Sequence, residues 1–153
     1  MSSSEKKAVT AMNNKKQRAV VICPGRGTYN KEELGYLTRL HSDKTEIIAL
    51  IDDYRDRQGQ MKIAELDSME NYSMRVHTAG ENASALIYAC ALSDYQAINK
   101  DKFDIVAVTG NSMGWYIALA VAGALAQPQA IDLINTMGSM MTKGLIGGQM
   151  IYP

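Results

Sequence analysis

The sequence has no excess of either charge and contains little cysteine. Sixteen basic residues balance sixteen acidic ones in a chain of 153, so no overall field attracts nucleic acid or an anionic membrane surface. Cys23 and Cys90 stand far apart in the chain and fit no metal-ligand spacing. We therefore expect no nucleic-acid partner, no metal site and two buried thiols in a reducing compartment.

Long apolar runs are also missing. The longest, residues 117–126, spans about ten residues, whereas a membrane-spanning helix needs roughly twenty. The first residues lack the apolar stretch of a signal peptide, and residues 1–17 are rich in serine, asparagine and lysine. These features predict a soluble, cytoplasmic protein with no membrane partner that begins with a disordered tail over residues 1–17.

Residues 18–153 are predicted to form one α/β domain built on a layered parallel sheet. Two short runs rich in valine and isoleucine, residues 19–23 and 105–108, each lead into a glycine-containing turn and are typical of buried strands. Strands that alternate with helices favour this fold class. Apolar residues at steps of three and four predict helices over residues 31–40, 44–57, 79–98, 114–126 and 127–143.

Two further segments and the packing of one helix complete the expected fold. Residues 61–66 indicate no single type of element, and residues 149–153 resemble the start of a third strand. The alanines of the helix predicted over residues 79–98 are small, so we expect that helix to pack closely against the sheet.

Gly110, Ser112 and Gly114 belong to the most informative motif, a Gly-Asn-Ser-Met-Gly turn between the second predicted strand and an apolar helix. A strand that turns sharply into a helix strains its corner residue, and the flanking glycines remove side chains that would collide there. Ser112 would stand exposed at the amino end of the helix, where unpaired N–H groups and the helix dipole favour negative charge. The motif predicts a nucleophilic serine suited to acyl transfer, with a purely structural glycine turn as the alternative.

Two segments together resemble the signatures of one enzyme family. Residues 23–28, Cys-Pro-Gly-Arg-Gly-Thr, resemble the F-P-G-Q-G-S signature of malonyl-CoA:acyl carrier protein acyltransferases. Residues 109–119 resemble the G-H-S-L-G-E-Y-x-A-L signature of that family, and residues 122–125 resemble the A-G-A-L that follows it. The resemblance extends from about Val20 to the end of the chain and implies the strand, nucleophile elbow and helix of the acyltransferase large domain.

The resemblance implies a ping-pong reaction of fatty acid or polyketide biosynthesis. A serine takes an acyl group from coenzyme A and passes it to the phosphopantetheine thiol of an acyl carrier protein, so acyl-CoA and the carrier protein are the expected partners and no other cofactor is needed. Ser112 would be the nucleophile. The backbone N–H groups of Met113 and Arg26 would hold the oxyanion, with a simple turn and a solvated charge as the alternative for the Arg26 segment.

Among the departures from the family pattern, three concern the surroundings of Ser112 and the acyl group. Asn111 replaces the histidine before the serine, and Trp115 replaces an acidic or similar residue after the second glycine. Met137 stands where the family places the arginine that pairs with the malonyl carboxylate, and a thioether cannot hold a carboxylate as a guanidinium does. Asn111 and Met137 are thus the predicted substrate-binding positions, and an uncharged acyl group is expected, although Met137 also fits ordinary core packing.

The general-base histidine of the family lies beyond residue 153, together with most of a small ferredoxin-like domain. His41 and His77 match neither family position, so both are predicted to be surface or structural histidines. We therefore expect an incomplete acyltransferase-like domain over residues 18–153, which a carboxy-terminal polypeptide would complete. A serine hydrolase or thioesterase, and a catalytically silent fragment acting as a binding module, remain as alternatives.

Four further side chains are predicted to have no chemical role. Asp52 and Asp53 are interpreted as a solvated helix face rather than an acid–base pair, and Met140 and Met141 as packing residues.

Overall fold

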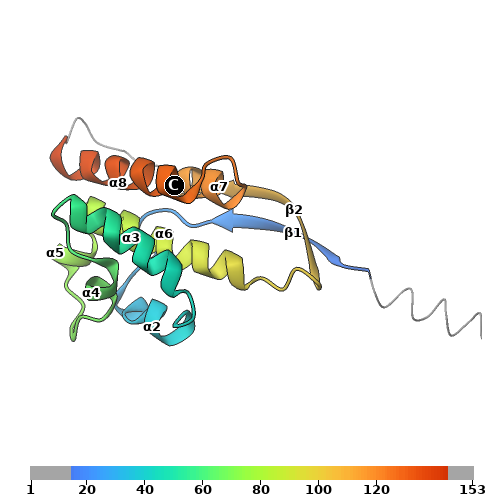
Figure 1. Cartoon of the computed structure of the whole chain (residues 1–153), viewed down its shortest axis with the longest axis horizontal. Coiled ribbons are helices and arrows are strands. Elements are labelled where there is room, and N and C mark those ends of the chain that lie inside the picture. The colour runs from blue at the N-terminus through green and yellow to red at the C-terminus, as the bar shows by residue number, and fades with distance from the viewer. Residues whose placement is uncertain (1–14, 145–153) are drawn as a thin grey trace, which may run out of the picture.

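The computed structural model describes residues 15–144 and confirms a mixed α/β fold (Figure 1). Two parallel strands, β1 (Gln17–Cys23) and β2 (Phe103–Gly110), form the sheet of this described part. The predicted tail lies outside the described residues over 1–14, while Gln17 already belongs to β1. The third strand predicted at residues 149–153 also lies outside them.

The two strands pair along their length, from Gln17 with Phe103 to Cys23 with Gly110. The register shifts after Ala19, which pairs with Ile105, whereas the next residue of β1 pairs with Ala107. Val106 is therefore an extra residue on β2, as in a β-bulge.

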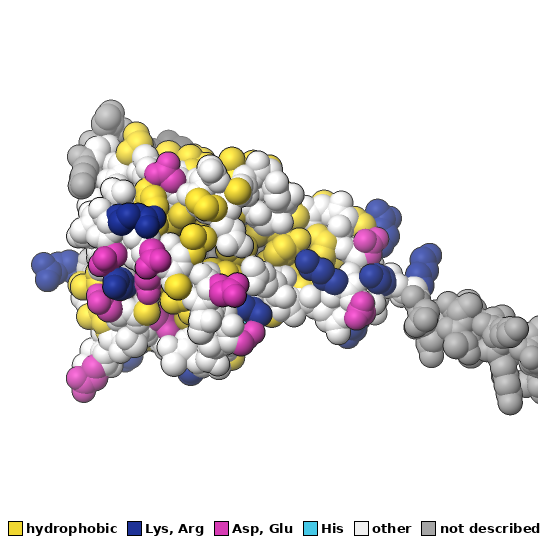
Figure 2. Space-filling view, in the orientation of Figure 1, with side chains coloured by type: hydrophobic (Ala, Val, Ile, Leu, Met, Phe, Trp, Pro, Cys, Tyr) yellow, Lys and Arg dark blue, Asp and Glu magenta, His cyan; other side chains and the backbone are white. Residues whose placement is uncertain are grey.

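One face of this sheet is left uncovered by the described residues. Val20 is 54 % exposed and Ile22 is 70 % exposed, while Val21 and Cys23 on the other face pack toward the core. Hydrophobic side chains are visible at the surface over the strands in Figure 2. The prediction of buried strands is thus wrong for one face, because a parallel sheet is normally covered on both sides and no described helix covers this one.

The connection from β1 to β2 is helical. The helix predicted over residues 31–40 is divided into a 3-10 turn, η1 (Lys31–Glu33), and a short helix, α2 (Tyr36–Leu40), because Gly35 between them adopts a left-handed conformation with φ of 79°. The remaining elements before β2 are α3 (Thr45–Arg57), α4 (Ile63–Asp67), α5 (Met74–His77) and α6 (Gly80–Ala97). The undecided segment 61–66 is therefore largely helical, and α5 was not predicted.

Two helices follow β2. Helix α7 (Gly114–Val121) ends before the predicted residue 126, since Gly123 takes a left-handed φ of 74° just after it. Helix α8 (Gln127–Lys143) carries Pro128 in its first turn, as predicted. In the view of Figure 1, α7 and α8 are drawn above β1 and α3 and α6 below it, and α7 is in contact with both strands.

Helix α6 packs along α8 rather than closely against the sheet, which corrects the prediction from its alanines. A Cβ atom on Gly138 of α8 would lie 2.6 Å from the carbonyl oxygen of Gly80 and 2.7 Å from the hydroxyl of Ser84, both on α6. Small residues on both helices therefore let their backbones come into contact. The core around this crossing consists of apolar residues from several helices, among them Ile51, Ile63, Leu66, Leu86, Ile117, Ile131 and Ile134.

A fully buried arginine also joins these helices. The guanidinium of Arg55 donates to the carbonyl oxygens of Met61 (2.6 Å) and Glu81 (2.9 Å) and to the amide oxygens of Asn82 (2.6 Å) and Asn135 (2.9 Å). Burial lowers the pKa of Arg55. Its hydrogen bonds tie the end of α3 to α6 and α8.

Asp52 differs from its predicted role. It is buried, and its carboxylate accepts a hydrogen bond from the backbone N–H of Ile63 at 2.6 Å, at the start of α4. Burial raises the pKa of Asp52. Only Asp53 lies on a solvated helix face, so the pair does not act as one surface feature.

Candidate active site around Ser112

Ser112 occupies a strained corner between β2 and α7. Strand β2 ends at Gly110, α7 begins at Gly114, and Ser112 has a φ of 52°. Within residues 15–144 it is the one non-glycine residue with positive φ. Such a conformation costs about 1–3 kcal/mol and is concentrated at functional sites.

The two glycines of the motif are required by close packing. A Cβ atom on Gly114 would lie 2.9 Å from the carbonyl oxygen of Pro24, in the loop after β1. A Cβ atom on Gly110 would lie 2.5 Å from the backbone nitrogen of Trp115. Both distances are shorter than a carbon atom tolerates, so the strand-to-helix turn depends on glycine at these positions.

The loop after β1 lies directly against this turn. A Cβ atom on Gly25 would be 2.9 Å from the carbonyl oxygen of Asn111 and 3.5 Å from the Cβ atom of Ser112. The backbone N–H of Asn111 also donates to the carbonyl oxygen of Cys23 at 3.2 Å. The two sequence motifs, about ninety residues apart in the chain and carried on neighbouring parallel strands, thus meet at one end of the sheet.

A cleft of about 430 Å³ opens beside Ser112. It brings together four of the five predicted site residues, namely Ser112, Met113, Arg26 and Met137. Asn111 does not line this cleft and is exposed beside Gly25. The remaining lining residues are Ser84, Tyr116, Gly138 and Met141.

The two predicted oxyanion donors are free of backbone partners. The N–H of Met113 immediately precedes α7, and neither it nor the N–H of Arg26 donates to a backbone carbonyl among the described residues. The next amides are occupied, since Gly114 donates to Asn111 at 2.8 Å and Trp115 donates to Ser112 at 3.1 Å. Free N–H groups at a helix start favour a developing negative charge.

The described lining of the cleft contains no histidine, aspartate or glutamate. His41 is buried, and its Nε2 lies 2.7 Å from the carboxylate of Asp94. His77 is fully buried, with its Nε2 lying 3.0 Å from the carbonyl oxygen of Leu66. Both histidines are structural, one of the two roles predicted for them, and neither lines the cleft of Ser112.

Four residues of the cleft were not predicted from the sequence. Ser84 enters it because α6 and α8 cross at Gly80 and Gly138, and the four-residue spacing of Gly80 and Ser84 was the signal for such a close crossing. Met141 lines the cleft and is 53 % exposed. Met140 is 58 % exposed. Neither methionine is therefore an interior packing residue, which corrects the prediction for both.

The cysteines offer no competing nucleophile. Cys23 is buried as predicted, whereas Cys90 is only partly buried. Burial raises the pKa of both thiols, which disfavours the reactive thiolate.

Two further properties of the described part concern metal binding and membranes. Residues 15–144 hold no group of three or more acidic, histidine or cysteine side chains arranged for a metal ion. Among the helices of this part, none has both the length and the apolar character to cross a membrane.

Neither a known protein family, nor a curated protein, nor a solved structure matches the chain.

Proposed function

We propose that this protein transfers acyl groups through an acyl-serine intermediate at Ser112. The donor is an acyl-CoA thioester and the acceptor is the phosphopantetheine thiol of an acyl carrier protein, as in fatty acid or polyketide biosynthesis. The observation that supports this proposal most is the strained φ of Ser112 at a strand-to-helix corner, in a cleft with the unpaired N–H groups of Met113 and Arg26. The order of strand, glycine loop, helices, strand, corner and helix further supports an acyltransferase-like domain.

The chemistry assigned to these residues comprises two exchanges. The Ser112 hydroxyl loses its proton and attacks the thioester carbonyl, the C–S bond breaks, and coenzyme A leaves as a thiol after taking up a proton. The carrier thiol then attacks the serine ester, the C–O bond breaks, and the Ser112 hydroxyl is restored. The N–H groups of Met113 and Arg26 stabilise the negative oxygen in both steps, and one such donor typically contributes 10²–10³-fold.

A base from another segment is part of the proposal. A serine hydroxyl is a weak nucleophile until a base removes its proton, and no acid–base side chain of the described residues lines the cleft. We propose that a further polypeptide, covalently joined or separate, supplies this base. The exposed side chains of Val20, Ile22 and Val106 give such a polypeptide an apolar surface on the sheet.

The lack of an acid–base side chain in the described lining of the cleft also favours a second candidate function. A chain without a base would bind acyl thioesters and load Ser112 slowly, and would thus act as a binding module rather than as an enzyme. A serine hydrolase differs in a separate respect, because water replaces the carrier thiol in the second exchange.

A single-turnover transfer assay tests the proposal. The protein is loaded with butyryl-CoA, and a phosphopantetheine-bearing acyl carrier protein is then added. We expect butyryl carrier protein to form with the native protein and with Ser84→Ala, which removes a hydroxyl of the same cleft, but not with Ser112→Ala. Release of free butyrate at the same rate with and without carrier would establish a hydrolase, and transfer by Ser112→Ala would refute the assignment.

A further inference from the structure

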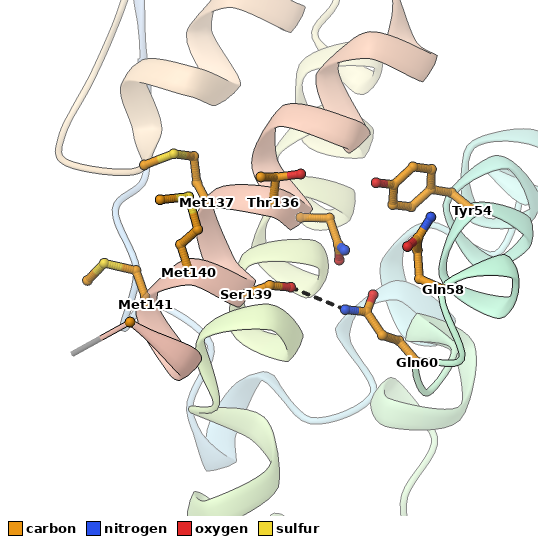
Figure 3. A pocket seen from close by; sticks show the side chains of 10 residues that line it. Tyr54, Gln58, Gln60, Thr136, Met137, Ser139, Met140 and Met141 are labelled. Atoms are coloured by element: carbon orange, nitrogen blue, oxygen red, sulfur yellow. Dashed lines mark hydrogen bonds between the residues drawn. The ribbon is translucent and has the colours of Figure 1, made fainter. Parts of the chain in front are cut away.

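A second cavity, of about 580 Å³, lies between the end of α3 and the second half of α8 (Figure 3). This volume lies within the range of small-molecule sites. The lining residues that the structure describes carry no charged side chain. One wall is made of amide and hydroxyl groups, including Tyr54, Gln58, Gln60 and Ser139, and the other is made of the methionines Met137, Met140 and Met141.

The cavity adjoins the cleft of Ser112. Met137 and Met141 line both spaces, so the two lie next to each other along α8. Met140 lines the cavity but not the cleft, and Met113 lines the cleft but not the cavity. Methionine is unbranched and flexible, so the side chains at this boundary can adapt to a ligand that extends from the cavity toward Ser112.

The polar wall contains an unused acceptor. The amide nitrogen of Gln60 donates to the hydroxyl of Ser139 at 3.3 Å, as the dashed line in Figure 3 marks. Its amide oxygen is buried and has no hydrogen-bond partner among the described residues. A buried acceptor of this kind is unfavourable unless a donor reaches it, so the wall is suited to a ligand with N–H or O–H groups.

We propose that this cavity binds the pantetheine arm of the thioester substrate. This inference rests on the proposed function, which supplies the thioester. The arm is uncharged, its amide and hydroxyl groups provide donors for the oxygen of Gln60, and its methyl groups pack on Met140 and its neighbours. A hydrocarbon acyl chain would leave the Gln60 oxygen unpaired, and a phosphate group would find no cationic side chain in the described lining.

Carbon-13 NMR of labelled methionine methyl groups tests the inference without requiring acyl transfer. Pantetheine is titrated into the full chain carrying Ser112→Ala, which cannot be acylated at that position. We expect a saturable shift of the Met140 methyl signal. Gln60→Leu, which replaces the amide by an apolar side chain of similar size, should weaken the binding of pantetheine about tenfold through the loss of one hydrogen bond.

Gln129→Leu is the matched control, because it makes the same change at an exposed position on α8 outside the cavity, and it should leave the affinity unchanged. Shifts confined to Met113, the absence of a saturable shift, or equal affinities in Gln60→Leu and Gln129→Leu would each overturn the inference. If Gln60→Leu does not fold, the Met140 signal of the Ser112→Ala protein still decides the question.

Loading the native protein with butyryl-CoA separates this inference from the proposed function. Removal of free coenzyme A after loading should leave a shift at Met113 and none at Met140. An equal shift at Met140 would place the acyl chain in the cavity and overturn the inference. Pantetheine binding at Met140 without any acylation of Ser112 would refute the proposed function alone.

Discussion

Replacing Ser112 by glycine should stabilise the protein relative to alanine at the same position. Ser112 has a φ of 52°, a left-handed conformation that costs a residue with a Cβ atom about 1–2 kcal/mol. Glycine avoids this cost. Its greater conformational freedom stabilises the unfolded chain, however, and lowers the free energy of unfolding by about 0.4–1 kcal/mol. The difference leaves Ser112→Gly more stable than Ser112→Ala by about 0.5–1 kcal/mol, and neither variant can form an acyl-serine at this position.

Urea unfolding of the two variants measures this difference. The same pair of substitutions at Ser139 is the control, since this residue lies within helix α8, where alanine is favoured over glycine by about 1 kcal/mol. We therefore expect opposite signs at the two positions. If Ser112→Ala equals or exceeds Ser112→Gly in its free energy of unfolding, the corner is not strained and the reasoning from its backbone is wrong.

Three further predictions concern selectivity, stability and rate. In competition between butyryl-CoA and malonyl-CoA, butyryl should load preferentially, and Met137→Arg should shift the ratio toward malonyl. Unfolding of Arg55→Leu should show a loss of about 3–5 kcal/mol, because four oxygens in or near the interior lose their donor, whereas the exposed Arg57→Leu on the same helix should lose less than about 0.5 kcal/mol. In steady-state assays the 153-residue chain should turn over about 10²–10⁴-fold more slowly than an enzyme with a positioned base, and a rate of about 1–10³ per second would show that one of its own groups serves as the base.

The local parts of the fold were predictable from the sequence. The two strands of the described part, the long helices and the turn at Ser112 are confirmed because their signals are short-range, namely apolar periodicity and glycines at a sharp corner. The meeting of Arg26 with Ser112 followed from the order of the two motifs and from the parallel pairing of their strands. Asn111 was predicted to bind substrate because it replaces the histidine that precedes the serine in the family signature, but it does not line the cleft.

Features that depend on the packing of distant elements were not predictable. Nothing local distinguishes the covered face of β1 from the exposed face with Val20 and Ile22, since both are apolar. The burial of Asp52 and Arg55 depends on partners in α4, α6 and α8. The cavity between α3 and α8 likewise depends on how these two helices pack, although more than half of the described sequence lies between them.

Mass spectrometry of the protein after incubation with butyryl-CoA tests the central claim most directly. Among residues 15–144, Ser112 alone occupies a strained corner beside free N–H groups, so the intact mass should increase by one butyryl group, and peptide mapping should place that group on Ser112. Absence of the adduct in Ser112→Ala is the matching expectation. A butyryl group mapped to another residue, or an adduct that persists in Ser112→Ala, would contradict the account.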